Sequence, residues 1–153
     1  MRRLLEEVKR EHFPNPPASA EQVAQFESAQ GWMLDEDLRA FYLACNGAKL
    51  FRKLGATYFF LPLERIIRAR LSICGEDSEE CGPGFLYAIC DVQDNNYVAV
   101  DVRNSGGPYP LFDCFHETFP EPAYTRQIAP SFSSFLEQAL RSKGHLFWLG
   151  GAG

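Results

Sequence analysis

The chain has 153 residues and a mass of 17.3 kDa, which is enough for one domain that buries roughly 69% of its unfolded surface. Its 46% hydrophobic, 14% aromatic and 23% charged residues exclude the disordered, collagen-like and coiled-coil classes. The net charge of −5 is unevenly distributed: residues 1–75 hold eleven Lys and Arg against nine Asp and Glu, and residues 76–153 hold four against eleven. This balance argues against a nucleic-acid partner and suits a basic one.

The compartment is predicted from two features of the sequence. The opening segment MRRLLEEVKRE mixes charges among its apolar residues, and nowhere do eighteen apolar residues follow one another. The five cysteines are an odd number with no CxxC pair, which favours reduced thiols over a disulfide framework. We therefore expect a cytoplasmic, soluble protein with no membrane partner.

Three helices are predicted in the front part of the chain. Leu4, Leu5 and Val8 form an apolar stripe that must end before Pro14. A second helix begins with the capping-box pattern of Ser19 and Gln22 and closes at Gly31. A third helix has Asp35 as its N-cap, an apolar stripe, and Asn46-Gly47 at its end; the stripe consists of Leu38, Phe41, Tyr42 and Cys45.

The pattern changes to short strands and loops after Ala48. Residues 49–51 and 57–61 are typical of strands, whereas residues 63–71 fit a helix or a strand equally well. The segment CGEDSEECGPG at residues 74–84 combines four carboxylates with glycine and proline, which predicts an exposed loop.

The second half is predicted to contain a hairpin, a third strand and a closing helix. FLYAICDV and YVAVDV alternate in polarity around the turn QDNN, which indicates an antiparallel pair. NSGGP makes another turn, YPLFDCF a strand and FPEPAYTRQ an irregular return. The last helix begins at Ser131 and ends at Gly144, and its apolar face must cover a sheet; this face consists of Phe132, Phe135, Leu136, Ala139 and Leu140.

This order of elements predicts the fold class. Helices first, then strands in meander order and one final helix indicate an α+β fold with an antiparallel or mixed sheet, and exclude the alternating βαβ pattern of a dinucleotide-binding fold. With neither repeat nor linker, residues 1–153 are expected to be a single domain with a glycine-rich tail from about residue 144. The sequence leaves open whether the tail is ordered.

Four ordered motifs resemble one known family. QFESAQGWMLDEDLRAFYLACNGA is similar to a helix, a glycine, Leu-Pro and a second helix ending in Asn-Gly, and Asp35 stands where proline is usual. FLPLERI, DVQDNNYVAVDV and IAPSFSSFLEQAL follow in the family's order. The chain thus resembles the SUKH superfamily, which contains the fungal Smi/Knr cell-wall-synthesis regulator and many bacterial toxin-immunity proteins.

The resemblance implies a function as well as a fold. It implies an α+β protein-binding scaffold with no shared catalytic set and no cofactor, whose bacterial members neutralise a cognate toxin, often a nuclease or a deaminase. The toxin itself is not identified by the resemblance, nor is the oligomeric state. The alternatives are a regulatory scaffold of the Smi/Knr type and a small thiol hydrolase.

The enzyme alternative depends on Cys114 and His116, because a cysteine nucleophile needs a neighbouring base. Two residues apart on a strand, their side chains would lie about 7 Å apart, too far for a direct hydrogen bond, so a structural role is favoured. The cysteines are too widely spaced for a zinc knuckle, and Asp91, Asp94 and Asp101 do not have the spacing of a calcium loop. Neither a catalytic nor a metal site is expected.

Two further features are candidate partner-binding sites. Trp32 and Trp148 could be anchors, but a tryptophan just after a helix is more often packed in the core, and we favour this for Trp32. The candidate partner-binding residues are Glu76, Asp77, Glu79 and Glu80, four carboxylates in five residues that could meet a basic toxin domain and speed its association. The competing interpretation of this cluster is a solvated loop.

Overall fold

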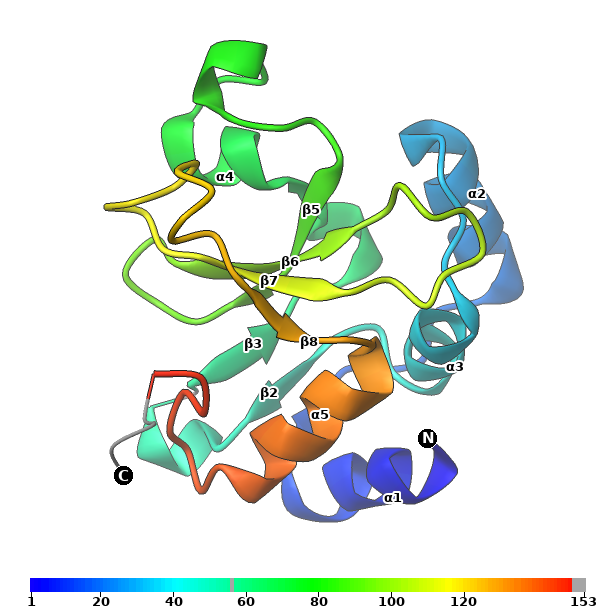
Figure 1. Ribbon diagram of the computed structural model, residues 1–153. Coiled ribbons are helices and arrows are strands. Elements are labelled where there is room, and N and C mark those ends of the chain that lie inside the picture. Colours follow the sequence, from blue (N-terminus) through cyan, green and yellow to red (C-terminus); the bar gives the residue numbers. More distant parts are fainter. Residues whose placement is uncertain (56, 150–153) are drawn as a thin grey trace.

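The computed structural model describes residues 1–55 and 57–149, and these residues form an α+β fold (Figure 1). One antiparallel sheet contains eight strands within the described residues, in the order β1-β2-β3-β5-β6-β7-β8, with β4 paired to β5. The strands are β1 (Phe13–Pro14), β2 (Ala48–Leu50), β3 (Tyr58–Phe60), β4 (Ile67–Arg68), β5 (Leu86–Asp91), β6 (Tyr97–Asp101), β7 (Leu111–Cys114) and β8 (Gln127–Ala129). The sheet is therefore antiparallel, not mixed.

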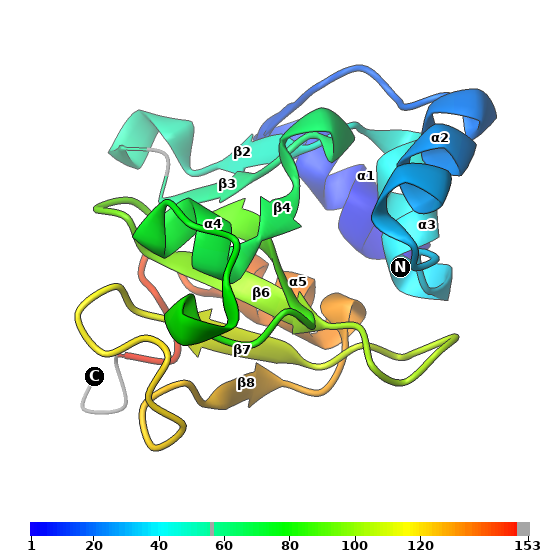
Figure 2. The ribbon, with the colours of Figure 1, turned by 90° about the horizontal axis from the view of Figure 1, so that it is seen from above.

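Helices cover both faces of this sheet. The α-helices are α1 (Arg2–Glu11), α2 (Ala20–Gln30), α3 (Glu36–Ala44), α4 (Ala69–Cys74) and α5 (Phe132–Arg141), and short 3₁₀ helices are η1 (Arg52–Leu54), η2 (Leu63–Arg65) and η3 (Glu79–Cys81). The main core joins the sheet to α1, α2, α3 and α5. A second, smaller core packs α4 on the other face, as Figure 2 shows.

Local sequence signals begin the helices as predicted. Ser19 Oγ accepts from Gln22 N at 3.0 Å, and Gln22 Oε1 accepts from Ser19 N at 2.8 Å, which completes the predicted capping box. Asp35 and Ser131 cap α3 and α5 by accepting from the backbone N–H three residues later. Helix α5 places five buried apolar side chains against the sheet, which confirms that it covers one face.

Asn46 and Gly47 do not form a left-handed turn at the end of α3; they connect this segment to η2 and to β3 instead. Helix α3 stops at Ala44, and Cys45 is extended, with a φ of −157°. Asn46 Oδ1 accepts from Leu63 N at 2.8 Å and so joins this segment to η2. Gly47 has a φ of +90°, and a Cβ there would lie 2.5 Å from the Phe60 carbonyl oxygen. Glycine is thus required by close backbone contact as well as by conformation.

The sheet also differs from the predicted strands. The ambiguous segment 63–71 is divided among η2, β4 and the start of α4. The segment 74–84 contains the end of α4 and η3 in addition to loop. Strands β1 and β8 were not predicted, and β8 lies partly in the segment expected to be an irregular return. The hairpin β5–β6 is confirmed, with positive φ at Gln93, Asp94 and Asn95 in its turn.

The predicted tail falls partly outside the described residues. Its last four residues, 150–153, are not described. Before them, Leu146, Phe147 and Trp148 pack against the main core, and Thr57 Oγ1 donates to the Gly144 carbonyl at 2.9 Å. The segment from 144 to 149 is consequently part of the folded unit.

Candidate functional site

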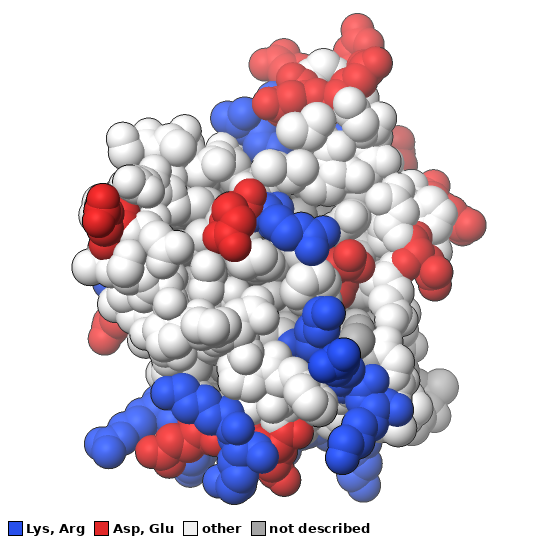
Figure 3. Space-filling model, turned by 180° about the vertical axis from the view of Figure 1, so that it is seen from behind, with Lys and Arg blue, Asp and Glu red and all other residues white. Residues whose placement is uncertain are grey.

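The four predicted partner-binding residues lie together at one end of the molecule, between α4 and β5. We call Glu76, Asp77, Glu79 and Glu80 the acidic tip. All four are exposed. Figure 1 shows this segment projecting beyond the sheet, and Figure 3 shows acidic side chains gathered at the same end. The exposed loop predicted from composition is therefore a protruding surface.

Asp77 differs from the other three carboxylates. Its two oxygens accept from Arg68 Nη1 at 2.9 Å and from Arg70 Nε at 2.7 Å. The hydrogen bond from Arg70 is the main reason that the pKa of Asp77 lies below its usual value, and Arg68 lowers it further. Asp77 thus anchors the loop, while Glu76, Glu79 and Glu80 make no ion pair with any described residue.

The same two arginines fix the loop to the body of the protein. Arg68 Nε donates to the Gly84 carbonyl at 2.9 Å, and Arg70 Nη1 donates to the Gly82 carbonyl at 3.1 Å. The Arg68 guanidinium also lies 5.4 Å from the centroid of the Tyr87 ring. Three carboxylates are thereby presented from an anchored segment, which lowers the entropy lost when a cationic partner binds.

Cys114 and His116 do not form a catalytic pair. Strand β7 ends at Cys114, so His116 lies beyond the strand and not two positions along it. The Cys114 side chain is fully buried, its Sγ lies 3.9 Å from the Phe112 carbonyl, and burial raises its pKa far above the ordinary value of a thiol. His116 Nδ1 lies 2.8 Å from Asn96 Oδ1. A buried, protonated thiol without a base is not a nucleophile.

Two of the carboxylates considered as metal ligands make hydrogen bonds that hold the local structure. Asp91 accepts from Gln93 N at 2.7 Å in the hairpin turn, and the buried Asp101 accepts from Arg103 Nη2 at 2.8 Å. Across residues 1–55 and 57–149, no three His, Cys, Asp or Glu side chains are grouped so as to hold a metal ion. In the same part of the chain, no helix is long and apolar enough to cross a membrane.

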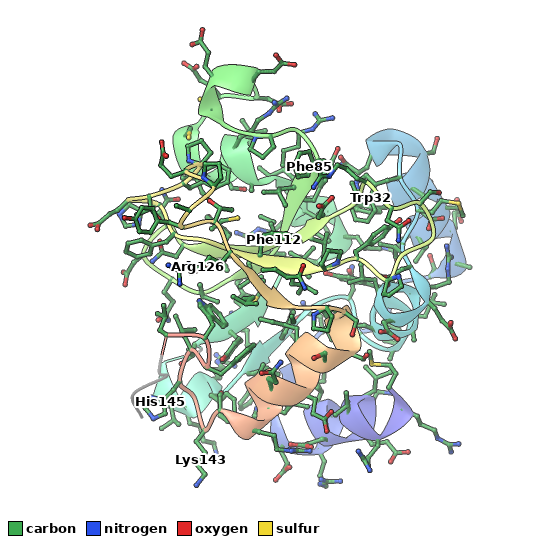
Figure 4. The ribbon with its side chains drawn as sticks, in the orientation of Figure 1. Trp32, Phe85, Phe112, Arg126, Lys143 and His145 are labelled. Atoms are coloured by element: carbon green, nitrogen blue, oxygen red, sulfur yellow. The ribbon has the colours of Figure 1, made fainter. Side chains whose placement is uncertain are left out.

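Both tryptophans belong to the core. Trp32 is 8% exposed, and its ring centroid lies 5.3 Å from that of Phe26 and 5.1 Å from that of Tyr87. Figure 4 shows Trp32 directed between α2 and the sheet. The predicted core role of Trp32 is confirmed. Trp148 is partly buried against Phe135 and Tyr58, so it is not a free anchor either.

Two arrangements were missed from the sequence. Asp35 caps α3 through Oδ1, and its Oδ2 also accepts from Tyr109 N at 2.9 Å, 74 residues away. Cys74 Sγ also lies 3.6 Å from the Cys81 carbonyl oxygen, across the base of the acidic tip. The seven-residue spacing of the cysteines gave no signal for this contact.

Comparison with known proteins supplies the family. The sequence model of the SMI1/KNR4 family (SUKH-1) matches residues 17–138. This range contains every strand of the sheet except β1. It also contains the acidic tip and the helices from α2 to most of α5. Among curated proteins, the search finds no match. Because the matched residues make up most of the chain and its fold, the chain belongs to the SMI1/KNR4 family.

Proposed function

We propose that this protein is a non-enzymatic, cytoplasmic protein-binding domain that acts as an immunity protein and neutralises a cognate bacterial toxin. The observation that carries the proposal is the acidic tip, which protrudes, is anchored through Asp77, and presents three carboxylates that make no ion pair with any described residue. Membership of the SMI1/KNR4 family supports a binding role. The buried thiol of Cys114 supports the same conclusion, because it removes the best candidate for a nucleophile.

The tip fits a basic protein surface because of its charge and its attachment. Carboxylates at the rim of an interface mainly increase the rate of association, and this increase falls as salt screens the charges. The chain carries a net charge of −5, so the wider field of the protein favours the approach of a cationic domain. In the proposed complex, this protein covers the active site of the toxin and so blocks its activity.

The test depends on the proposed toxin: if a toxin gene neighbours the gene of this chain, its product is the partner used. Glu76, Glu79 and Glu80 are changed together to Gln, and Asp77 is kept because its loss would release Arg68 and Arg70. The matched control changes Glu21, Glu36 and Glu137, which are exposed and lie on α2, α3 and α5. Stopped-flow mixing at low and high salt measures association.

We expect association to slow by about tenfold at low salt for the tip variant and much less for the control, with the difference shrinking at high salt. Dissociation should change little. Equal rates for the wild type and the tip variant at low salt would leave the tip as a solvated loop. Failure to neutralise the toxin, together with weak binding to several host proteins, would favour the regulatory scaffold instead.

A further inference from the structure

A second charged surface lies on the part of the sheet that α4 does not cover. In this part, the outward side chains of β1, β2 and β3 are brought into one row by the strand register: Phe13 is opposite Lys49, and Lys49 is opposite Phe59. The neighbouring residues Tyr58 and Phe60 are buried in the main core on the other face. The row therefore reaches the surface: Phe13 is exposed, while Lys49 and Phe59 are half-buried and Phe59 packs against the edge of the main core.

Cations lie against the aromatic rings of this row. The Lys49 Nζ and the Arg65 guanidinium are 5.1 and 5.3 Å from the centroid of the Phe59 ring. The Arg52 guanidinium is 5.2 Å from the centroid of the Phe13 ring. Lys53 follows Arg52 in η1 and is exposed. We call Lys49, Arg52, Lys53 and Arg65, with Phe13 and Phe59, the basic face.

The cations of this face make no ion pair with any residue that the structure describes, although the strand register places Asp91 opposite Phe59 at one end of the row. Seven of the fifteen Lys and Arg residues are in ion pairs. The four cations of the basic face are among the other eight, and none of them pairs with a described residue. Figure 3 shows basic side chains running down this side of the molecule, away from the acidic tip. A protein with a net charge of −5 thus carries a local cationic surface.

A hollow adjoins the Phe13 end of the basic face. It has a volume of about 520 Å³, and its lining combines apolar groups with the cations Arg52 and Lys53, with His12, and with Arg10 and Glu11, which pair with each other at 3.4 Å. Phe13 is 39% exposed and Leu54 is 68% exposed at its edge. Apolar side chains this exposed beside Arg52 and Lys53, which make no ion pair with a described residue, suit a ligand that brings both carboxylates and an apolar group.

We propose that the basic face binds an acidic segment of a protein partner, with its carboxylates on Lys49 and Arg65 and an apolar side chain in the hollow beside Phe13 and Leu54. The charge complementarity is local, because physiological salt screens charges beyond about 8 Å. A short acidic segment therefore meets the four cations without meeting the acidic tip.

A nucleic acid fits this face less well. Single-stranded nucleic acids bind by stacking their bases on open aromatic rings. Here Phe59 and Phe13 are already occupied by Lys49, Arg65 and Arg52, so stacking would have to displace these contacts. A long polyanion would also extend beyond the four cations onto a protein of net negative charge.

The test measures fluorescence anisotropy with a labelled heptapeptide in which glutamate alternates with leucine. The variant Lys49→Gln/Arg65→Gln removes two cations from the face, and the control Arg3→Gln/Lys9→Gln removes two exposed, unpaired cations from α1. The Leu54→Ser variant tests the hollow. A peptide with lysine in place of glutamate and a labelled single-stranded RNA are run alongside.

We expect the glutamate peptide to bind the wild type, and to bind the face variant about tenfold more weakly with the control nearly unchanged. Leu54→Ser should weaken binding severalfold, and chemical shift changes in the ¹⁵N-labelled protein should fall on β1, β2, β3 and η1. Absence of binding, equal weakening in the face variant and the control, or tighter binding of the RNA would each overturn the proposal. Variants of the acidic tip should bind this peptide normally, so the outcome is independent of the toxin proposal.

Discussion

Asp35 connects two parts of the chain that are 74 residues apart, and its replacement by alanine tests how the fold is held together. The side chain is 4% exposed and accepts two backbone hydrogen bonds, from Leu38 N and Tyr109 N, each 2.9 Å long. Asp35→Ala removes the N-cap of α3, which costs about 1 kcal/mol. It also leaves the Tyr109 N–H without its acceptor, which costs a further 1–3 kcal/mol or so.

One effect opposes this loss. Burial raises the pKa of Asp35, so the charged carboxylate is held at some cost in the folded state. Alanine removes that cost together with the hydrogen bonds. We therefore expect a net loss of about 1–3 kcal/mol in the free energy of unfolding at neutral pH. The control Glu36→Ala removes an exposed carboxylate from the same helix turn and should cost about 0.5 kcal/mol or less.

The pH dependence gives an independent check on Asp35. Its folded pKa lies above the unfolded value of 3.8, so between these two values the folded protein binds more protons than the unfolded chain. Stability contributed by Asp35 therefore falls as the pH rises through this window. The gap in stability between wild type and Asp35→Ala should widen as the pH is lowered from 7 toward 4.

Urea unfolding followed by circular dichroism measures both effects. Wild type, Asp35→Ala and Glu36→Ala are compared at several pH values with a common slope against urea. A loss no larger than that of Glu36→Ala would refute the role of the Tyr109 contact. A gap that narrows at low pH would show that the hydrogen bonds to the carboxylate outweigh its desolvation.

Three further predictions concern packing, backbone and thiols. Phe135 is fully buried against Tyr58 and Phe60, so Phe135→Asp should lower stability by about 4 kcal/mol or more in thermal or urea unfolding, and unchanged stability would contradict the role of α5. A Cβ on Gly107, at a φ of +70°, would lie 2.6 Å from the Asp35 Cβ, whereas one on Gly106, at a φ of +87°, meets nothing within 4 Å. Gly107→Ala should therefore lose clearly more stability in the same urea assay than Gly106→Ala, whose cost is about 1–2 kcal/mol from backbone strain alone. Maleimide should label the exposed Cys74 and half-buried Cys81 of the native protein before the buried Cys45, Cys90 and Cys114; burial raises the pKa of Cys45 to about 12, and mass spectrometry of the labelled peptides would reveal any other order.

Sequence reasoning succeeded where the interacting groups are neighbours in the chain. Ser19 and Gln22, or Ser131 and Ser134, are three residues apart, and the hydrogen bond between them is decided by helix geometry alone. The turn at residues 93–95 was predicted for the same reason, because positive φ favours particular residue types at adjacent positions.

The missed elements depend on distant partners. Strand β1 has two residues, one of them Pro14, and it exists because it pairs with β2, more than thirty residues later. Strand β8 similarly depends on β7. Neither segment is long enough to show a period of two, so their strand state follows from tertiary pairing and not from propensity.

The candidate site was predicted in composition but not in detail. Composition predicts that the four carboxylates share one loop, and it gives no reason to distinguish one of them from the others. Arg68 and Arg70 lie nine and seven residues before Asp77, and α4 and the following turn bring them back to it. Only the folded chain distinguishes an anchoring carboxylate from three that remain available to a partner.

The basic face was invisible in the sequence because its cations are not consecutive. Lys49 and Arg65 are sixteen residues apart, and they meet at one ring because β2 pairs with β3 and η2 follows it. In the composition, the four cations of this face contribute to the small excess of Lys and Arg over Asp and Glu in residues 1–75. A net charge of −5 therefore does not exclude a local cationic surface that takes an anionic partner. Since salt limits each charge to a range of about 8 Å, the acidic tip and the basic face act as separate surfaces, and each should select a partner of the opposite sign.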